Sequence, residues 1–234
     1  MTFTLHFRLF IYVVLGFIVF TIIGAVTHEA GHYIVAKKLG YEAKIRYASM
    51  HYENTDYETF RNFHFKNEEV LKSRTDKAVM KKYSILMHKA RKSANLVTLG
   101  GPVQTIITGT LGFLLLWFNR KKIGNKLTLL QWSFVFMAFF WTRQVANFFI
   151  GLYFLVIRGE WTSQGDETNI SEYFRLPIWS LNAITATIAI VLLLIVVFKL
   201  IPKQQRFTFI LGGLTGSIIG FPLWMKLLGP AILP

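Results

Sequence analysis

Cysteine is absent from this chain of 234 residues, so the chain can form no disulfide bond and offers no thiolate to a metal. A metal site would have to be built from histidine, aspartate and glutamate. Acidic residues are scarce as well, with 12 Asp and Glu against 26 Lys and Arg. Aspartate occurs only at Asp56, Asp76 and Asp166. The choice of a carboxylate ligand is therefore narrow.

Charged residues make up only 16% of the chain, while 53% of it is hydrophobic and the mean hydropathy is +0.43. This composition points away from a soluble globule. Most of the long uncharged runs can cross about 30 Å of hydrocarbon as a helix. We predict an all-α polytopic membrane protein with about five transmembrane helices and a small cytoplasmic β/α insert after the first. The runs are Leu9–Thr27, Ser93–Asn119, Leu127–Thr142, Leu176–Phe198 and Phe207–Met225.

These runs divide the chain into four expected parts. Residues 1–40 form the first transmembrane helix, and residues 41–94 form the basic insert. Residues 95–177 hold the second and third transmembrane segments, and residues 178–234 hold two more. The third segment, Leu127–Ile157, would be about 46 Å long as one helix, so we expect it to tilt, protrude or break. The first run is too long for the core of a secretory signal, and we expect it to be retained.

Two histidines and a glutamate stand at the end of the first apolar run, in the sequence Thr27-His28-Glu29-Ala30-Gly31-His32. Histidines four residues apart lie on one face of a helix and can share a Zn²⁺ ion, while the glutamate is placed to act as general base. The alternative is a helix end whose histidines lie among lipid headgroups. That alternative explains neither the spacing nor Glu29, so we predict a zinc hydrolase site.

Two further polar residues are expected at the depth of this motif. At the helical rise, His28 lies about 13 Å from Lys37, Gln104 about 12 Å into the second span, and Asn147 about 15 Å from Ile157. Polar groups at one depth can line a wet cavity around a metal, or each can bond to a neighbouring helix. We favour the cavity, with Asn147 and Gln104 as substrate-positioning residues.

The positive charge of +14 is concentrated in a way that favours a membrane surface rather than nucleic acid. Lys37 to Lys92 holds 14 Lys and Arg against 7 Asp and Glu, which is half of the excess. The positive-inside rule places this segment in the cytoplasm. We expect a bacterial cytoplasmic membrane with the active site toward the cytoplasm, although the opposite loops Asn119–Lys126 and Pro202–Arg206 are also basic.

Two elements are predicted within the insert. Tyr41–Tyr52 is β-prone and ends at a polar turn, which favours a strand or hairpin. The apolar residues of Val79–Ala90 recur at helical spacing with lysines on the other face, which predicts an amphipathic helix. This helix either lies on an anionic leaflet or packs on the protein itself.

Small residues recur every fourth position in two spans. Gly101, Thr105 and Gly109 follow this spacing in the second span, which lets another helix approach closely. In the last span Gly212, Gly216 and Gly220 predict a packing seam, with a contact inside the fold favoured over an oligomer.

Taken in order, HEAGHYIVAKKLGYEAKI and GGPVQTIITG resemble the site-2 protease family of intramembrane zinc metalloproteases. The resemblance implies that His28 and His32 bind zinc, that Glu29 is the catalytic base, and that an aspartate on a later segment completes the site. It also implies that the Tyr41–Tyr52 stretch presents a strand edge to an unwound substrate. Thr105 departs from the family pattern, which often has Asn after Gly-Pro-x-x.

Asp166 is our choice for the third ligand, because Asp56 and Asp76 lie in the charged insert. Asp166 is expected on the loop that returns to the face nearest the two histidines. It could instead cap a short helix before Pro177. Glu167 is the second choice for the ligand. Glu53 or Glu58 would be expected in a protease of the class that uses a distant glutamate.

The expected activity is hydrolysis of a peptide bond in or near a transmembrane segment of a membrane protein substrate. Two other functions remain open. One is a catalytically inactive membrane protein that binds transmembrane partners, and the other is a membrane-anchored zinc protease that acts on soluble or misfolded proteins. The oligomeric state is left open.

Overall fold

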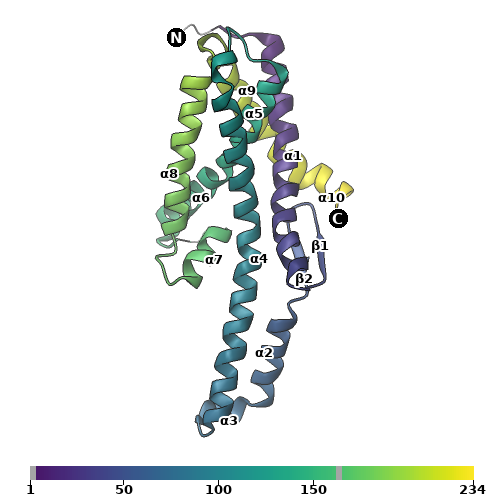
Figure 1. Cartoon of the computed structure of the whole chain (residues 1–234), viewed down its shortest axis with the longest axis vertical. Coiled ribbons are helices and arrows are strands. Elements are labelled where there is room, and N and C mark those ends of the chain that lie inside the picture. Colours follow the sequence, from purple (N-terminus) through teal and green to yellow (C-terminus); the bar gives the residue numbers. More distant parts are fainter. Residues whose placement is uncertain (1–3, 162–164) are drawn as a thin grey trace.

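In the computed structural model, residues 4–161 and 165–234 are described, and the chain forms an elongated helical bundle with a helical arm at one end (Figure 1). Within these residues, five stretches are helical, long and apolar enough to cross a membrane. The predicted all-α polytopic membrane protein is confirmed. The five stretches are α1 (Phe7–Lys38), α4 (Lys77–Phe118), α5 with α6 (Leu129–Ala138 and Thr142–Arg158), α8 with its π-helical end (Ser180–Ile195 and Val196–Leu200), and α9 with a π-helical turn and α10 (Lys203–Pro222, Leu223–Leu228 and Gly229–Ile232).

The predicted hairpin is present in the insert. Strands β1 (Ala43–Ile45) and β2 (Met50–Tyr52) pair antiparallel with Lys44 opposite His51. Helices α2 (Thr55–Lys66) and α3 (Glu68–Ser73) follow. The side chain of Asn54 caps α2 by accepting a hydrogen bond from the backbone N–H of Tyr57. The insert is thus a two-stranded sheet followed by short polar helices.

Helix α4 runs for 42 residues without a break, from the N-cap Asp76 to Phe118. The expected boundary between residues 94 and 95 therefore has no structural counterpart, because the amphipathic stretch and the second span are one helix. The N-terminal part of α4 packs on α2, and together with α3 they form the arm. Of the two arrangements expected for this stretch, packing on the protein itself is the one observed.

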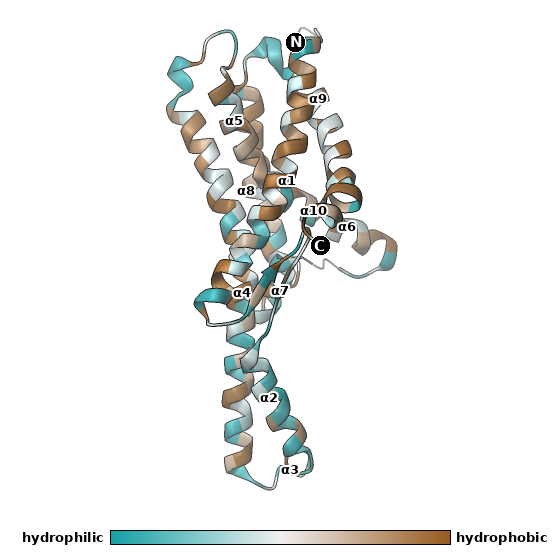
Figure 2. Ribbon diagram, turned by 90° about the vertical axis from the view of Figure 1, so that its right-hand side faces the viewer, coloured by the Kyte–Doolittle hydropathy of each residue, from teal (hydrophilic) through white to brown (hydrophobic). Residues whose placement is uncertain are grey.

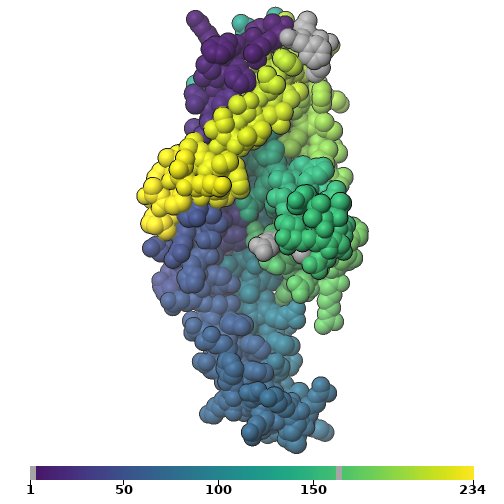
Figure 3. Space-filling model, turned by 180° about the vertical axis from the view of Figure 1, so that it is seen from behind, coloured from purple at the N-terminus to yellow at the C-terminus, as the bar shows by residue number. Residues whose placement is uncertain are grey.

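The third span is broken. Helix α5 ends at Ala138, a 3₁₀ turn covers Phe139–Trp141, and α6 leaves in a different direction (Figure 2). Seen from behind, α6 stands out beside the diagonal course of α9 (Figure 3). The break lets the chain turn toward the interior at Trp141, which is buried and packs over Gly109 of α4.

Aromatic side chains and glycines hold the end of the bundle that carries the N-terminus. The ring of Phe17 on α1 lies 5.6 Å from that of Phe136 on α5 and 5.7 Å from that of Phe209 on α9. The three glycines of the predicted seam, Gly212, Gly216 and Gly220, lie against α1, where Gly212 faces Val13. The predicted packing seam is therefore a contact within the fold. Figure 2 shows that hydrophobic residues gather in the bundle and hydrophilic ones in the arm and end loops.

Candidate metal centre

Two elements far apart in the sequence build the centre. Helix α1 supplies His28 and His32, which are 1% and 8% exposed. Helix α7 (Asp166–Tyr173) supplies Asp166 as its first residue, after the N-cap Gly165, whose lack of a side chain leaves the cap position without a side-chain hydrogen bond. The short helix expected here is thus present, but Asp166 is not its cap. Its carboxylate is directed at the histidines instead.

The three predicted ligands meet in one triangle of atoms. His28 Nε2 lies 3.0 Å from Asp166 Oδ2 and 3.2 Å from His32 Nε2, and His32 Nε2 lies 3.5 Å from Asp166 Oδ2. Donors bound to a tetrahedral Zn²⁺ at 2.0–2.1 Å would be about 3.3–3.4 Å apart. The group can therefore hold a metal ion with small adjustments. Two neutral imidazoles and a carboxylate are also a donor set that zinc accepts.

The other nitrogen of each imidazole is held by α4. His32 Nδ1 lies 2.8 Å from the carbonyl oxygen of Val97, which can only accept, so Nδ1 carries the proton. His28 Nδ1 lies 2.9 Å from the hydroxyl oxygen of Thr105, and we assign the same tautomer there. Both Nε2 atoms then present lone pairs to the centre. The backbone N–H of Gly101, at 3.3 Å from His32 Nδ1, is the weaker contact.

Glycines let α1 and α4 approach closely at this level. A Cβ atom built on Gly31 would overlap the backbone carbonyl of Gly100, and a Cβ on Gly100 would overlap that of Gly31. A Cβ on Gly101 would overlap the Nε2 atoms of both His28 and His32. A side chain at residue 101 would thus fill the place beside the two donor atoms.

Charged groups surround the carboxylate of Asp166. Burial alone would raise its pKa, but without a metal ion a protonated Nε2 of His28 or His32 donates to the carboxylate, which outweighs burial and holds the pKa below its usual range. Arg143 Nη2 lies 3.9 Å from Asp166 Oδ2 and stabilises the same charged form. Asp166 is therefore an anion in the centre, as a metal ligand must be.

Glu29, the expected base, is 8% exposed on α1 next to His28. Within residues 4–161 and 165–234, its carboxylate has no hydrogen-bond or ion-pair partner. A carboxylate that is not engaged elsewhere is available to exchange a proton with a bound water.

The two expected positioning residues lie beside the centre with partners of their own. Asn147 donates to Glu167 Oε2 at 3.0 Å, and Gln104 donates to the Thr108 hydroxyl at 3.0 Å. Glu167, the second-choice ligand, is buried and faces Asn147 rather than the histidines. Substrate positioning by Asn147 and Gln104 stays a prediction.

Glu53 and Glu58, the distant glutamates, belong to the insert. The only group of three potential metal ligands among the described residues is His28, His32 and Asp166.

The face of α4 that orients the histidines was not predicted from the sequence. Val97, Gly101 and Thr105 are four residues apart, so they share one helix face, and all three contact the imidazoles. The spacing from Gly101 to Thr105 was visible in the sequence. What the spacing alone did not reveal is that this face packs against His28 and His32 rather than against apolar side chains.

The fold and the centre define an all-α polytopic membrane protein with a buried His–His–Asp group that can hold a metal ion. Comparison with models of protein families, with curated proteins and with solved structures gives no match.

Proposed function

We propose that the protein is a zinc-dependent intramembrane protease that hydrolyses a peptide bond in or near a transmembrane segment of a membrane protein substrate. The observation that supports this proposal is the triangle formed by His28 Nε2, His32 Nε2 and Asp166 Oδ2. Such a group is costly inside a membrane protein, so its presence within the length of a membrane-spanning helix favours a function for it.

The donor set selects the metal by its chemistry. The chain has no cysteine, and two imidazoles with one carboxylate leave a fourth position open for water, as catalytic zinc sites do. A bound Zn²⁺ would supply polarisation of the scissile carbonyl and a lower pKa for the attacking water. Val97 and Thr105 keep the imidazole lone pairs directed inward, which lets the site bind the ion with little reorganisation.

Glu29 moves the proton in this proposal. Its carboxylate accepts a proton from the attacking water and later delivers a proton to the leaving amine nitrogen. The Glu29 carboxylate is buried and has no other partner among the described residues. Both features suit a general base, because little bulk water competes with the attacking water for it. Arg143, 3.9 Å from Asp166, offsets the negative charge of the site.

The substrate must be extended at the cleavage point, because a helical peptide bond has its carbonyl engaged within the helix. The hairpin of β1 and β2 packs against α1 and provides backbone groups for strand addition. The excess of cations in residues 37–92 favours the cytoplasm for the insert and for the end of α1 that carries the site.

The test is cleavage of a co-expressed single-span substrate together with zinc content by elemental analysis. We expect Glu29→Gln to keep zinc and to lower cleavage by about 10²–10⁴-fold, the usual effect of losing a general base. Asp166→Asn should lose zinc, while Asp76→Asn, which changes an N-cap of α4 outside the centre, should keep both zinc and cleavage.

Two outcomes of these experiments would favour a different function for the protein. Absence of stoichiometric metal, with equal phenotypes for wild type and Glu29→Gln, would favour a membrane protein that binds transmembrane partners without catalysis. Degradation of a soluble unfolded substrate in detergent would favour a membrane-anchored protease of wider specificity.

A further inference from the structure

The end of the bundle opposite the arm carries positive charge without any negative charge. In the sequence, acidic residues occur only from Glu29 to Asp76 and from Glu160 to Glu172. The start of α1, the turn after α4 and the junction before α9 meet at this end, away from both acidic stretches (Figure 1). The segments that meet here contribute only cations. They are Arg8, Arg120, Lys121, Lys122, Lys126, Lys199, Lys203 and Arg206.

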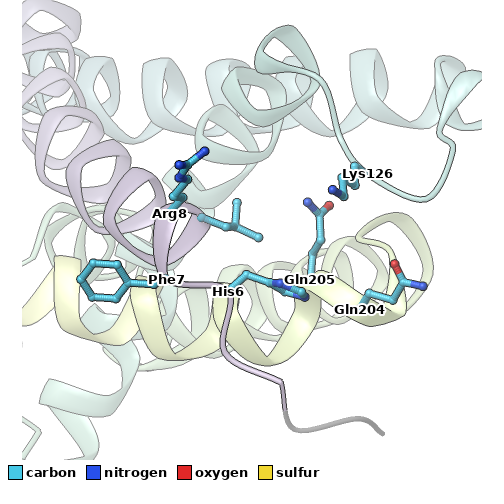
Figure 4. Close-up of a pocket in the computed structure, with 7 residues that line it drawn as sticks. His6, Phe7, Arg8, Lys126, Gln204 and Gln205 are labelled. Atoms are coloured by element: carbon cyan, nitrogen blue, oxygen red, sulfur yellow. The ribbon is translucent and has the colours of Figure 1, made fainter.

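A pocket of about 400 Å³ opens among these cations. Arg8 lies on one side of it, and Lys126 lies on the other beside the amide of Gln205 (Figure 4). His6 and Gln204 add further polar groups to the lining. The lining contains no acidic side chain, so every charged group in it favours an anion.

The walls of the pocket are fixed by hydrogen bonds between distant segments. The backbone N–H of Leu127 donates to Gln205 Oε1 at 3.1 Å, which ties the loop before α5 to α9. The backbone N–H of His6 donates to the Thr208 hydroxyl at 3.0 Å, which ties the start of α1 to the same helix. Because its amide oxygen is engaged, Gln205 has its Nε2 donor left for a ligand.

The two cations of the lining are free to bind. Neither Arg8 nor Lys126 makes an ion pair within the part of the chain that the structure describes. Both are exposed at the mouth of the pocket. A guanidinium on one side of the pocket, with an ammonium and an amide donor on the other, is suited to a phosphate group, which accepts several hydrogen bonds at once.

The position of the pocket favours a lipid over a soluble ion as its ligand. Two membrane-spanning stretches begin here, α1 at Phe7 and α9 at Lys203, so the pocket lies at the level expected for headgroups. Phe7 is 67% exposed, and together with Leu9 it gives the pocket an apolar border. Acyl chains can continue along this border, whereas an inorganic ion gains nothing from it.

We propose that this pocket binds the phosphate of an anionic phospholipid headgroup between Arg8 and Lys126. The bound lipid joins the first and last spans at the end of the bundle away from the metal centre. This site is independent of the proposed protease activity, and its test needs no cleavage assay.

The test counts retained lipid on the purified full-length protein. Wild type is released from phosphatidylcholine nanodiscs that contain a minority of phosphatidylglycerol, and native mass spectrometry measures the phosphatidylglycerol that stays bound. The pocket variant is Arg8→Gln with Lys126→Gln. The matched control is Lys121→Gln with Lys122→Gln, which removes the same charge at the same end but lies outside the lining.

We expect the pocket variant to retain phosphatidylglycerol at least about tenfold more weakly, because each cation near an anionic headgroup contributes about one kcal/mol, and a tenfold change corresponds to about 1.4 kcal/mol. The control should change retention by no more than about twofold. Equal losses in both variants, or no loss in either, would overturn the proposal, because diffuse attraction would then account for the binding.

Two further experiments test the lipid site. Gln204→Glu places an acid in the lining at an exposed residue, so it should weaken retention without affecting folding. Thermal unfolding in lipid-free detergent tests inorganic phosphate against chloride at equal ionic strength. Stabilisation of wild type by phosphate, without selective retention of phosphatidylglycerol, would overturn the lipid in favour of the free ion.

Discussion

The two halves of α1 pack against different kinds of atoms. The N-terminal half buries Val13 and Phe17 among rings from α5 and α9. The C-terminal half buries His28 and His32 against a hydroxyl and backbone groups of α4. The first half is packed as a membrane bundle requires, whereas the second places polar groups where unsatisfied ones are expensive.

The same contrast extends through the neighbouring helices. Around Phe17, the contacts are with the rings of Phe136, Phe139 and Phe209. Around the metal centre, buried polar atoms without a partner in the described residues recur, including Nε of Arg143, which pairs with Asp166, and one carboxylate oxygen of Glu167. The difference indicates that the apolar half stabilises the bundle, whereas the polar half carries groups that are costly to bury.

Gly101→Ala should give the largest effect on the polar half. The new Cβ would overlap both Nε2 atoms, so we expect the zinc content of the purified protein to fall to near zero by elemental analysis. Gly124→Ala is the control, because a Cβ there meets nothing within 4 Å. Full zinc occupancy in Gly101→Ala would contradict the arrangement of the donor atoms.

Phe136→Ala should affect the apolar half and spare the polar one. Phe136 is 3% exposed, and we expect a loss of about 3 kcal/mol in the free energy of unfolding in detergent. This loss is at the low end of the range for a buried Phe→Ala substitution. Membrane helices are held together by packing and gain little from the transfer of side chains out of water. Zinc per folded molecule should not change. Phe149→Ala, at a residue 53% exposed on α6, is the matched control. If Phe136→Ala also lost zinc, the two halves would not be separable.

Thr105→Val removes the oxygen beside His28 Nδ1 and keeps the shape of the side chain. Loss of a group that orients a ligand commonly lowers metal affinity about 10–100-fold, and we expect that range here. A zinc titration against a competing chelator measures it. Thr105→Ser should restore most of the affinity, and an unchanged affinity in Thr105→Val would show that the hydroxyl does not orient the imidazole.

Local patterns in the sequence predicted the spans and the meeting of His28, His32 and Asp166. Long apolar runs have few alternatives to helices, and the shortage of aspartates left one candidate outside the insert. The hairpin also followed from a local pattern. For the spans and the hairpin the information lay in neighbouring residues, whereas Asp166 was selected by elimination among the three aspartates of the chain and by the family resemblance.

Features that depend on contacts between distant segments were not predicted. The continuity of α4 depends on α2 packing beside its polar half, and the position of α7 depends on Asn182 of α8, which donates to the Thr168 hydroxyl. The orientation of the imidazoles by Val97 and Thr105 depends on which face of α4 meets α1. Spacing defines a helix face, but only packing decides what the face touches.

Gln144→Met sharpens the comparison by removing a polar group that has no partner in the described residues. Gln144 is 0% exposed, and both of its amide atoms lack such a partner. An unpaired buried amide costs about 1–3 kcal/mol, so we expect Met, which is similar in shape, to raise the free energy of unfolding by that amount. Thermal unfolding in detergent measures this, with zinc content unchanged. A lower stability would mean that the amide is hydrogen-bonded, for example to water.

Asp56→Asn tests a polar contact outside the bundle, where the effect should be smallest. Asp56 accepts a hydrogen bond from the Tyr41 hydroxyl at 2.7 Å and pairs with Lys89 at 2.9 Å, and so joins the hairpin, α2 and α4. Burial would raise its pKa, but hydrogen bonds from Lys89 and Tyr41 outweigh burial and lower the pKa below its usual 3.8. The carboxylate therefore favours the folded arm.

Because the pKa is lower in the folded protein, the contribution of Asp56 is complete above its unfolded value and disappears as the pH falls through the folded value. At neutral pH we expect Asp56→Asn to lose about 1 kcal/mol or less, since Lys89 is largely exposed. Unfolding midpoints of wild type and variant, measured from neutral to acid pH, should converge as the pH falls. A difference between the two midpoints that stays constant with pH would mean that the charge of Asp56 does not stabilise the folded arm. Polar groups at this end of the molecule would then contribute to stability through packing alone.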